Sequence, residues 1–398
     1  VGIILPLFVF GVYLLMLRKY SLLTIFKALL YIGVASSFLP LLWYIAAWKQ
    51  GGDKFLNVVL AENFGRFFHL DTPDITYDFG VWYNFVTLAG GFIPWTIFFF
   101  FSIFGLKWQL KNISFKQIAK DSWNNILSME KEKLFSLVAL VCIIFFYSLP
   151  SSKRSVYLMP AYPFIAIFLA QYAIYITEYR TKVTRIFAAF LVSVTTVVLI
   201  AIGLTMTGII DPVAIASQYT SRPSTLTQVE AVSNMFSSGC GLTVCIVIIV
   251  LIALLTVLYQ MSKKINIKIL YATIALTFAI NLLVDGVIMR GIRQEGSARP
   301  FAERVMKEYP LTKDNMFVMN NLKVYRNLYG LNFYLGNRFH NFEEVMPKEG
   351  FFFATPSDLE VVQKNYGGQY TFNILTSSER IIHEVRRPVL LCSFLRIE

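Results

Sequence analysis

Long apolar runs separated by short polar segments dominate this 398-residue chain. A helix needs roughly 20 predominantly apolar residues to cross the hydrocarbon core of a bilayer. The pattern therefore predicts a mainly α, polytopic membrane protein with about eight transmembrane helices. The runs lie at about 1–17, 28–47, 81–104, 134–149, 156–176, 186–209, 239–259 and 269–287.

The segments between these runs alternate in charge. An excess of Lys and Arg marks the cytoplasmic loops of membrane proteins. The less basic connections, 48–80, 150–155, 211–238 and the tail from about 288, are therefore predicted on the outer side. The basic connections contain Arg18, Lys19 and Lys27; Lys107, Lys111, Lys116, Lys120, Lys131 and Lys133; Arg180, Lys182 and Arg185; and Lys263, Lys264 and Lys268.

From residue 288 on, the pattern changes to short elements. Helices that alternate with short strands are typical of a small α/β domain, and roughly 110 residues are enough to bury a core. We therefore predict a transmembrane domain over 1–287 and an outer-side α/β domain over 288–398. Its predicted helices are Ala298–Tyr309, Tyr325–Leu335 and Pro356–Asn365, and its predicted strands are Asn315–Met319, Gly350–Ala354, Tyr370–Leu375 and Val389–Arg396.

The composition agrees with a chain that lies mostly in lipid. Only 15% of the residues are charged and 56% are hydrophobic, whereas soluble domains are about one quarter charged. The net charge of +12 is typical of nucleic-acid binders too, but here the cations lie in short loops between apolar runs. The four cysteines and three histidines show no metal-ligand spacing. We assign no metal and no cofactor, and metal dependence stays open.

The chain starts at Val1, inside an apolar run and without a methionine. This run has neither the basic start nor the small-residue cleavage site of a signal peptide. We interpret the sequence as a fragment that lacks its N-terminal part.

The outer connection 150–155 carries more charge than a turn needs. Pro150 and the two serines after it supply the turn, and Lys153 and Arg154 follow, with Tyr157 close behind. Arg offers a planar fork and Lys a point charge to phosphate oxygens. The alternative is that both cations extend to the membrane surface or encode topology. Their outer position opposes the usual charge bias and favours binding of a lipid-linked phosphate.

The outer connection 48–80 has an apolar stripe over residues 54–68, which predicts an amphipathic helix lying in the membrane interface. Glu62 and Arg66 fall on one face, where a simple ion pair would contribute about 0.2–0.5 kcal/mol. The alternative is that Glu62, Asn63 and Arg66 border a cavity and hold a sugar or phosphate. Both interpretations stay open at this point.

Four motifs follow one another along the chain. They are Glu62-Asn-Phe-Gly-Arg-Phe67, Tyr83 with Gly91-Phe-Ile-Pro-Trp95, Lys153-Arg-Ser-Val-Tyr-Leu-Met-Pro160 with Pro163, and Leu331-Asn-Phe-Tyr-Leu-Gly336. In their order and spacing the chain resembles the GT-C membrane glycosyltransferases of the ArnT / protein-mannosyltransferase superfamily, in particular ArnT-like enzymes, which move aminoarabinose onto lipid A. The resemblance covers essentially the whole chain.

This resemblance implies a sugar transferase that uses a polyprenyl-phosphate donor at the outer leaflet of the bacterial inner membrane. The acceptor would be lipid A, a protein or another cell-envelope glycan, and the sugar would be transferred with inversion. Lys153 and Arg154 match the family's basic residue before the Tyr-Leu-x-Pro motif, which is associated with the carrier phosphate. The acidic pair of the family's first outer loop matches no residue here, so the catalytic residues are expected upstream of Val1.

The alternative function is a transporter or flippase of lipid-linked sugars. Such proteins place ionisable residues near the bilayer midplane, where each costs about 2.5–3.5 kcal/mol on insertion scales. The apolar runs here are nearly free of charge, and Asp285 lies near the outer end of its run. This distribution favours surface chemistry over passage through the membrane. A catalytically inactive binding protein stays open as a third interpretation.

Overall fold

The computed structural model describes residues 2–60, 79–80, 82–105, 115–150, 153–239, 241–319 and 328–397. The contacts divide the chain into two compact units. The first comprises Val1–Leu191 with Val257–Thr273, and the second comprises Val192–Thr256 with Ile274–Glu398. The boundary between 287 and 288, predicted from the change in sequence pattern, stays a prediction.

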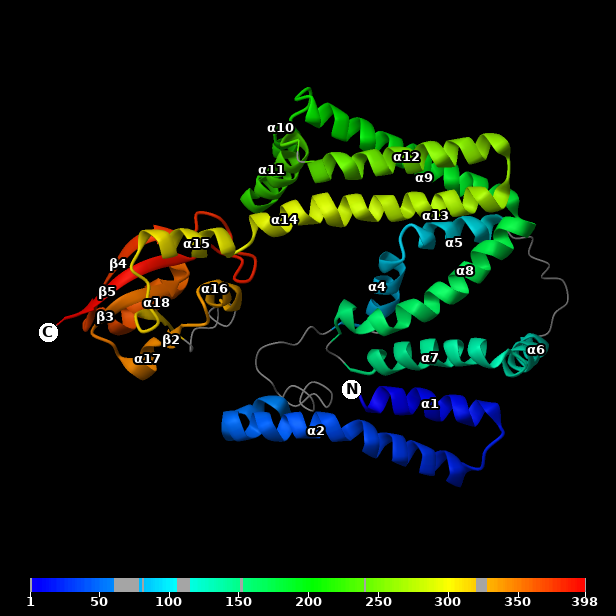
Figure 1. Ribbon diagram of the computed structural model, residues 1–398, viewed down its shortest axis with the longest axis horizontal. Coiled ribbons are helices and arrows are strands. Elements are labelled where there is room, and N and C mark those ends of the chain that lie inside the picture. Colours follow the sequence, from blue (N-terminus) through cyan, green and yellow to red (C-terminus); the bar gives the residue numbers. More distant parts are fainter. Residues whose placement is uncertain are drawn as a thin grey trace. The chain divides into compact units, whose positions relative to one another are not determined.

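The first unit is helical. Helices α1, α7 and α8 run side by side in it (Figure 1). Leu5 and Val9 of α1 pack on Leu134, Val138 and other buried residues of α7. The elements are α1 (Ile4–Leu17), α2 (Leu22–Leu60), α4 (Tyr83–Gly91), α5 (Trp95–Gly105), α6 (Phe115–Leu127), α7 (Lys131–Ser148), η2 (Ser155–Ala161), α8 (Tyr162–Tyr179) and the start of α9 (Thr181–Met206).

The helices of the second unit pack around an apolar cluster that includes Ile202, Phe236, Val250 and Val287. A single π-helical turn, Val284–Ile288, interrupts the helix that continues from α13 into α14. Helices α9, α12 and α13 extend into both units. The further helices are α10 (Pro212–Tyr219), α11 (Pro223–Ser237), α12 (Gly241–Lys263), α13 (Asn266–Leu283), α14 (Met289–Glu295) and α15 (Arg299–Glu308).

The predicted apolar runs all contain helices. Among the described residues, five helices are long and apolar enough to cross a membrane, and α4 with α5 makes a sixth candidate, bent by 97°. Helix α1 is shorter, and α7 begins with three charged residues. The run 81–104 forms two helices instead of one, because Pro94 lacks a backbone donor and disfavours helix in the residue before it.

The C-terminal residues of the second unit form the predicted α/β arrangement. The five-stranded sheet has the order β2-β1-β3-β5-β4. Strand β1 pairs in parallel with β2 and β3, and β5 pairs antiparallel with β3 and β4. The strands are β1 (Met316–Val318), β2 (His340–Asn341), β3 (Glu349–Ala354), β4 (Tyr370–Ser377) and β5 (Leu390–Arg396).

Both faces of the sheet are covered. Because side chains alternate along a strand, Met316 and Val318 face one core, which α15 and α16 (Tyr329–Tyr334) complete. Phe317 faces the other core, completed by α17 (Phe342–Val345) and α18 (Pro356–Tyr366). Each helix and strand predicted here has a counterpart, and β2 and α17 were not predicted. Residues 325–327 of the predicted helix Tyr325–Leu335 lie outside the described residues, and α16 covers its described part.

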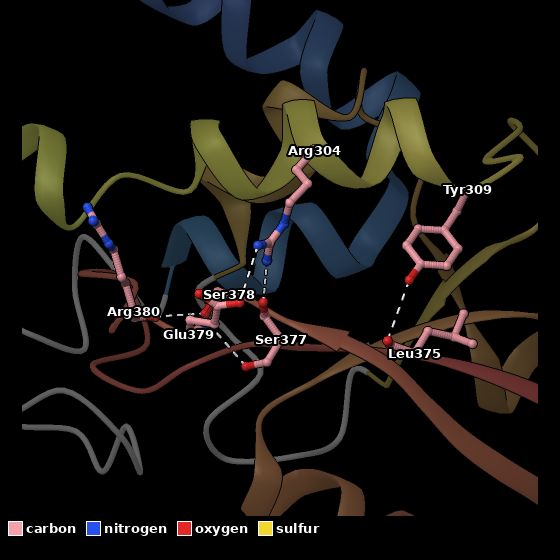
Figure 2. Close-up of polar contacts among 7 residues, drawn as sticks. All are labelled: Arg304, Tyr309, Leu375, Ser377, Ser378, Glu379 and Arg380. Atoms are coloured by element: carbon pink, nitrogen blue, oxygen red, sulfur yellow. Dashed lines mark hydrogen bonds and ion pairs between the residues drawn. The ribbon is translucent and has the colours of Figure 1, made fainter.

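Polar contacts fix α15 to the end of β4 (Figure 2). The Arg304 guanidinium donates to the Ser377 carbonyl and lies 3.5 Å from the Glu379 carboxylate. The Tyr309 hydroxyl lies 3.5 Å from the Leu375 carbonyl oxygen. These contacts join the first helix of this region to a strand more than 60 residues later, so the helix and the sheet form one body.

Candidate functional site

The segment from Ser148 to Ala161 connects α7 with α8 and carries the predicted phosphate-binding residues. Helix α7 ends at Ser148, two residues before Pro150, whose ring disfavours helix in the preceding residue. Arg154 has extended backbone, and the next residue starts the 3₁₀ helix η2. Residues 151 and 152 lie outside the described part of the chain. The sequence thus places Lys153 and Arg154 on a short non-helical connection between two helices.

Lys153 is buried, with 5% of its surface exposed. Its ammonium donates to the Phe79 carbonyl at 2.9 Å and to the Pro150 carbonyl at 2.7 Å. No carboxylate among the described residues lies within ion-pair distance of it. A buried cation is costly unless it is paired, and an ammonium has three donors, of which the carbonyls take two. Among the described groups, the third donor and the positive charge have no partner, and this makes the position suited to an anion.

Asn84 fastens the start of α4 to the end of α7. Its side chain is 1% exposed and donates to the Tyr147 carbonyl and the Ser148 hydroxyl, both at 3.0 Å. The rings of Phe79 and Tyr83 stack at 4.2 Å. Phe79 and Asn84 therefore hold the candidate connection, Phe79 at Lys153 and Asn84 at the end of α7. Sequence reasoning missed Asn84, although a single amide within an apolar run is a usable signal.

Tyr157 and Arg154 complete the candidate set. Both side chains are half-buried. The Tyr157 ring stacks on Tyr147, with centroids 5.6 Å apart and an interplanar angle of 23°. The Tyr157 backbone amide donates to the Arg154 carbonyl at 3.1 Å. The three residues predicted to bind a phosphate thus lie within the short segment 153–157, and ring stacking holds Tyr157 against α7.

Tyr162 approaches Gly91 so closely that only a glycine fits at the start of the Gly91-Phe-Ile-Pro-Trp95 motif without a shift of neighbouring atoms. A Cβ atom at Gly91 would lie 2.4 Å from the Tyr162 hydroxyl oxygen, at the start of α8. The Phe92 and Tyr162 rings are 5.0 Å apart, and Trp95 packs near Phe187 at 5.7 Å. The motif therefore brings the bend between α4 and α5 against the helix that follows the candidate site.

Two solved structures share this arrangement of elements. ArnT from Cupriavidus metallidurans, in a crystal structure with bound undecaprenyl phosphate, has a TM-score of 0.58 and 15% sequence identity, over 98% of this chain and 65% of that chain. The apo crystal structure of the same protein gives 0.54 and 14%, over 97% and 64%. The chain has the fold of ArnT. No protein-family model and no curated protein matches the sequence.

The ArnT likeness confirms, at the level of the fold, the GT-C resemblance carried by the motifs. The chain spans about two-thirds of the length of the ArnT structures that it matches. At this identity the likeness concerns the fold, and the roles of Lys153, Arg154 and Tyr157 stay predictions that rest on the local geometry described above.

Glu62, Asn63 and Arg66, predicted to border the cavity of this ArnT-like fold, lie outside the described residues. The predicted interfacial helix 54–68 is helical up to Leu60, after a break at Gly52, whose φ of 59° favours glycine. Its remainder is also outside the described residues. Among the residues that the structure does describe, no group of three His, Cys, Asp or Glu side chains is arranged to hold a metal ion.

Proposed function

We propose that this chain is part of a GT-C membrane glycosyltransferase that moves a sugar from a polyprenyl-phosphate donor to a cell-envelope acceptor. The observation that carries the proposal is Lys153, a buried cation held by two carbonyls and followed directly by Arg154. The ArnT-like fold supports it, because the ArnT of Cupriavidus metallidurans was crystallised with undecaprenyl phosphate.

The proposed step is a direct displacement at the anomeric carbon. An acceptor oxygen forms the new bond, the polyprenyl phosphate leaves with the electron pair of the old bond, and the configuration inverts. The acceptor proton goes to a base that we assign to no residue of this chain. Lys153 and Arg154 stabilise the charge that develops on the departing phosphate. One such charge-assisted contact contributes about 1.5–3 kcal/mol, or about one to two orders of magnitude in rate.

The acceptor is proposed as lipid A, a protein or another envelope glycan. The reaction is placed at the outer leaflet of a bacterial inner membrane, with residues 288–398 on the periplasmic side. Charge alternation along the sequence supports this placement. Asp285, the acid in the last apolar run, has an exposed side chain 4.0 Å from Arg293 in the same helical segment. A local pair of this kind favours a structural role for Asp285 over a place on a transport path.

The test compares Lys153→Met and Arg154→Gln with Arg222→Gln in the full-length protein. Arg222 is an exposed cation on another predicted outer connection, which makes it a matched control. Transfer of a labelled sugar from its polyprenyl phosphate to lipid A, measured in detergent, should fall by about 10–100-fold in each site variant. It should stay near the wild-type rate in the control.

A second measurement separates phosphate binding from loop stability, because the Lys153 ammonium also ties Phe79 to Pro150. Undecaprenyl phosphate should raise the melting temperature of the wild type but not that of folded Lys153→Met protein. Wild-type transfer rates in both site variants would contradict the phosphate role. Label that moves across vesicle membranes without leaving its carrier would support a flippase instead.

A further inference from the structure

A cavity lies at the end of α8 that is farther from the candidate phosphate site. It measures about 660 Å³, is open on one side, and is lined by the end of α5, the end of α8 and the start of α9. Helix α8 is 18 residues long, which corresponds to about 27 Å at 1.5 Å per residue. The Lys153 connection precedes this helix and the cavity lies where it ends, so the two sites are distinct.

The lengths of the adjoining helices indicate that this cavity lies at a membrane surface. The segments Ser155–Tyr179 and Thr181–Met206 are both long and apolar enough to cross a bilayer, and Arg180 alone separates them. The Arg185 guanidinium donates to the Asn266 side-chain oxygen at 3.0 and 2.9 Å. Asn266 begins α13, so the corner between α12 and α13 lies beside the corner between α8 and α9 (Figure 1).

The described residues of the cavity wall include two cations and no acid. Arg180 is half-buried and Lys182 is exposed. Neither side chain makes an ion pair or a hydrogen bond with any residue that the structure describes, and the lining residues within that part of the chain include no Asp or Glu. The Arg185 guanidinium, by contrast, donates a hydrogen bond to the Asn266 side chain. The cavity therefore presents two positive charges that the described part of the chain does not compensate.

The remaining walls are apolar and aromatic. Phe104 and Ile186 line the cavity and expose 87% and 59% of their surfaces. Tyr179 lies at the rim and packs on Tyr175, with ring centroids 4.8 Å apart. Tyrosines are enriched where a membrane protein crosses from hydrocarbon to headgroups. The walls thus supply a surface for an acyl chain next to the two cations.

We propose that this cavity binds an anionic phospholipid of the cytoplasmic leaflet. Arg180 and Lys182 bind the headgroup phosphate, and one acyl chain lies along Phe104 and Ile186. Basic pockets between transmembrane helices on the cytoplasmic side are suited to anionic headgroups. A soluble phosphate would contact the cations but leave the apolar walls uncovered. The inference is independent of the proposed transferase activity.

The test is native mass spectrometry of the detergent-purified full-length protein, titrated with phosphatidylglycerol, phosphatidylcholine or glycerol phosphate. Wild-type protein should retain phosphatidylglycerol about tenfold more strongly than phosphatidylcholine, and glycerol phosphate far more weakly than either. The double variant Arg180→Gln/Lys182→Gln should lose this preference. Lys263→Gln/Lys268→Gln removes the same charge from exposed positions outside the cavity and should keep it.

A third variant tests the acyl-chain wall. Phe104→Ala should weaken binding of both phospholipids while preserving the preference for the anionic one, because only apolar contact is lost. Equal retention of the two phospholipids by wild-type protein, or equal losses in the two double variants, would overturn the proposal. Glycerol phosphate bound as strongly as phosphatidylglycerol would identify a site for a soluble phosphate instead. If the Arg180→Gln/Lys182→Gln protein does not fold, the wild-type and Phe104→Ala comparisons decide.

Discussion

Asn84 is the residue on which the geometry of the candidate site depends most directly. It satisfies the Tyr147 carbonyl and the Ser148 hydroxyl at the point where α7 ends. Replacing it with Leu leaves both groups without this donor in a buried position, which costs about 1–3 kcal/mol. We therefore expect Asn84→Leu to lower the thermal unfolding midpoint, measured by fluorescence in detergent.

The control for this prediction is Asn124→Leu, because Asn124 lies on α6 and is exposed. This substitution should leave the midpoint nearly unchanged. If the two variants were equally stable, the bond from Asn84 to the end of α7 would not contribute to the stability of the site.

At the scale of single residues, the sequence predicts the charge at the site but not its surroundings. The sequence alone shows that Lys153 is a cation that the turn does not require. Its burial was not predictable, because the Phe79 carbonyl that binds it lies 74 residues earlier in the chain. The pairing of Tyr157 with Tyr147 likewise depends on how two helices meet.

The bend between α4 and α5 positions the next element, and Gly91 sets how closely α8 approaches it. An added Cβ would lie 2.4 Å from the Tyr162 hydroxyl oxygen, so Gly91→Ala forces the tyrosine or the helix to move. Overpacking of this kind costs about 1–3 kcal/mol. We expect Gly91→Ala to lower the unfolding midpoint and, if the proposed function holds, the transfer rate.

Two comparisons make this prediction specific. The neighbouring Gly90 has no atom within 4 Å of an added Cβ, so Gly90→Ala should have little effect on either measurement. Tyr162→Phe removes the oxygen that an alanine at position 91 would meet and should restore part of the stability of Gly91→Ala. Equal losses of stability in the two glycine variants would contradict the contact with α8, because alanine has the higher helix propensity and would by itself raise the midpoint.

At the scale of elements, helices and strands with a clear hydrophobic pattern were predictable, and short or polar elements were not. Strand β1 was predicted from its run of apolar residues. Both of its faces are buried, so it lacks the alternation of polar and apolar residues that marks a half-buried strand. The two-residue strand β2 is too short to show a pattern. Helices α10 and α11 were missed in a polar connection, yet each begins with a proline, and Asp211 caps the first by accepting from the Val213 amide. These are recognised start signals.

At the scale of the whole molecule, the side of the membrane on which each connection lies decides whether the two proposals are compatible. The Lys153 connection is predicted outside and the Arg180 corner inside, because basic residues concentrate in every second connection. Helix α8 joins them, so a single reversal of topology would exchange the two sites. Both proposals therefore depend on the same membrane topology.

Labelling from outside with a membrane-impermeant maleimide tests this topology. Cysteines introduced as Ser152→Cys, Lys116→Cys and Lys307→Cys report on the phosphate connection, a basic connection and the exposed face of α15. We expect the first and third to be modified in intact cells and the second only after the membrane is opened. Cys240, at the start of an apolar run, is replaced by serine in every variant.

The remaining native cysteines should give little background. Burial raises the pKa of the Cys392 thiol to about 12, so near neutral pH almost none of it is the reactive thiolate. Cys142 is buried and Cys245 lies within an apolar helix. Modification at Lys116→Cys but not at Ser152→Cys would place Lys153 on the cytoplasmic side. It would contradict a donor site at the outer leaflet, even if the fold were otherwise as described.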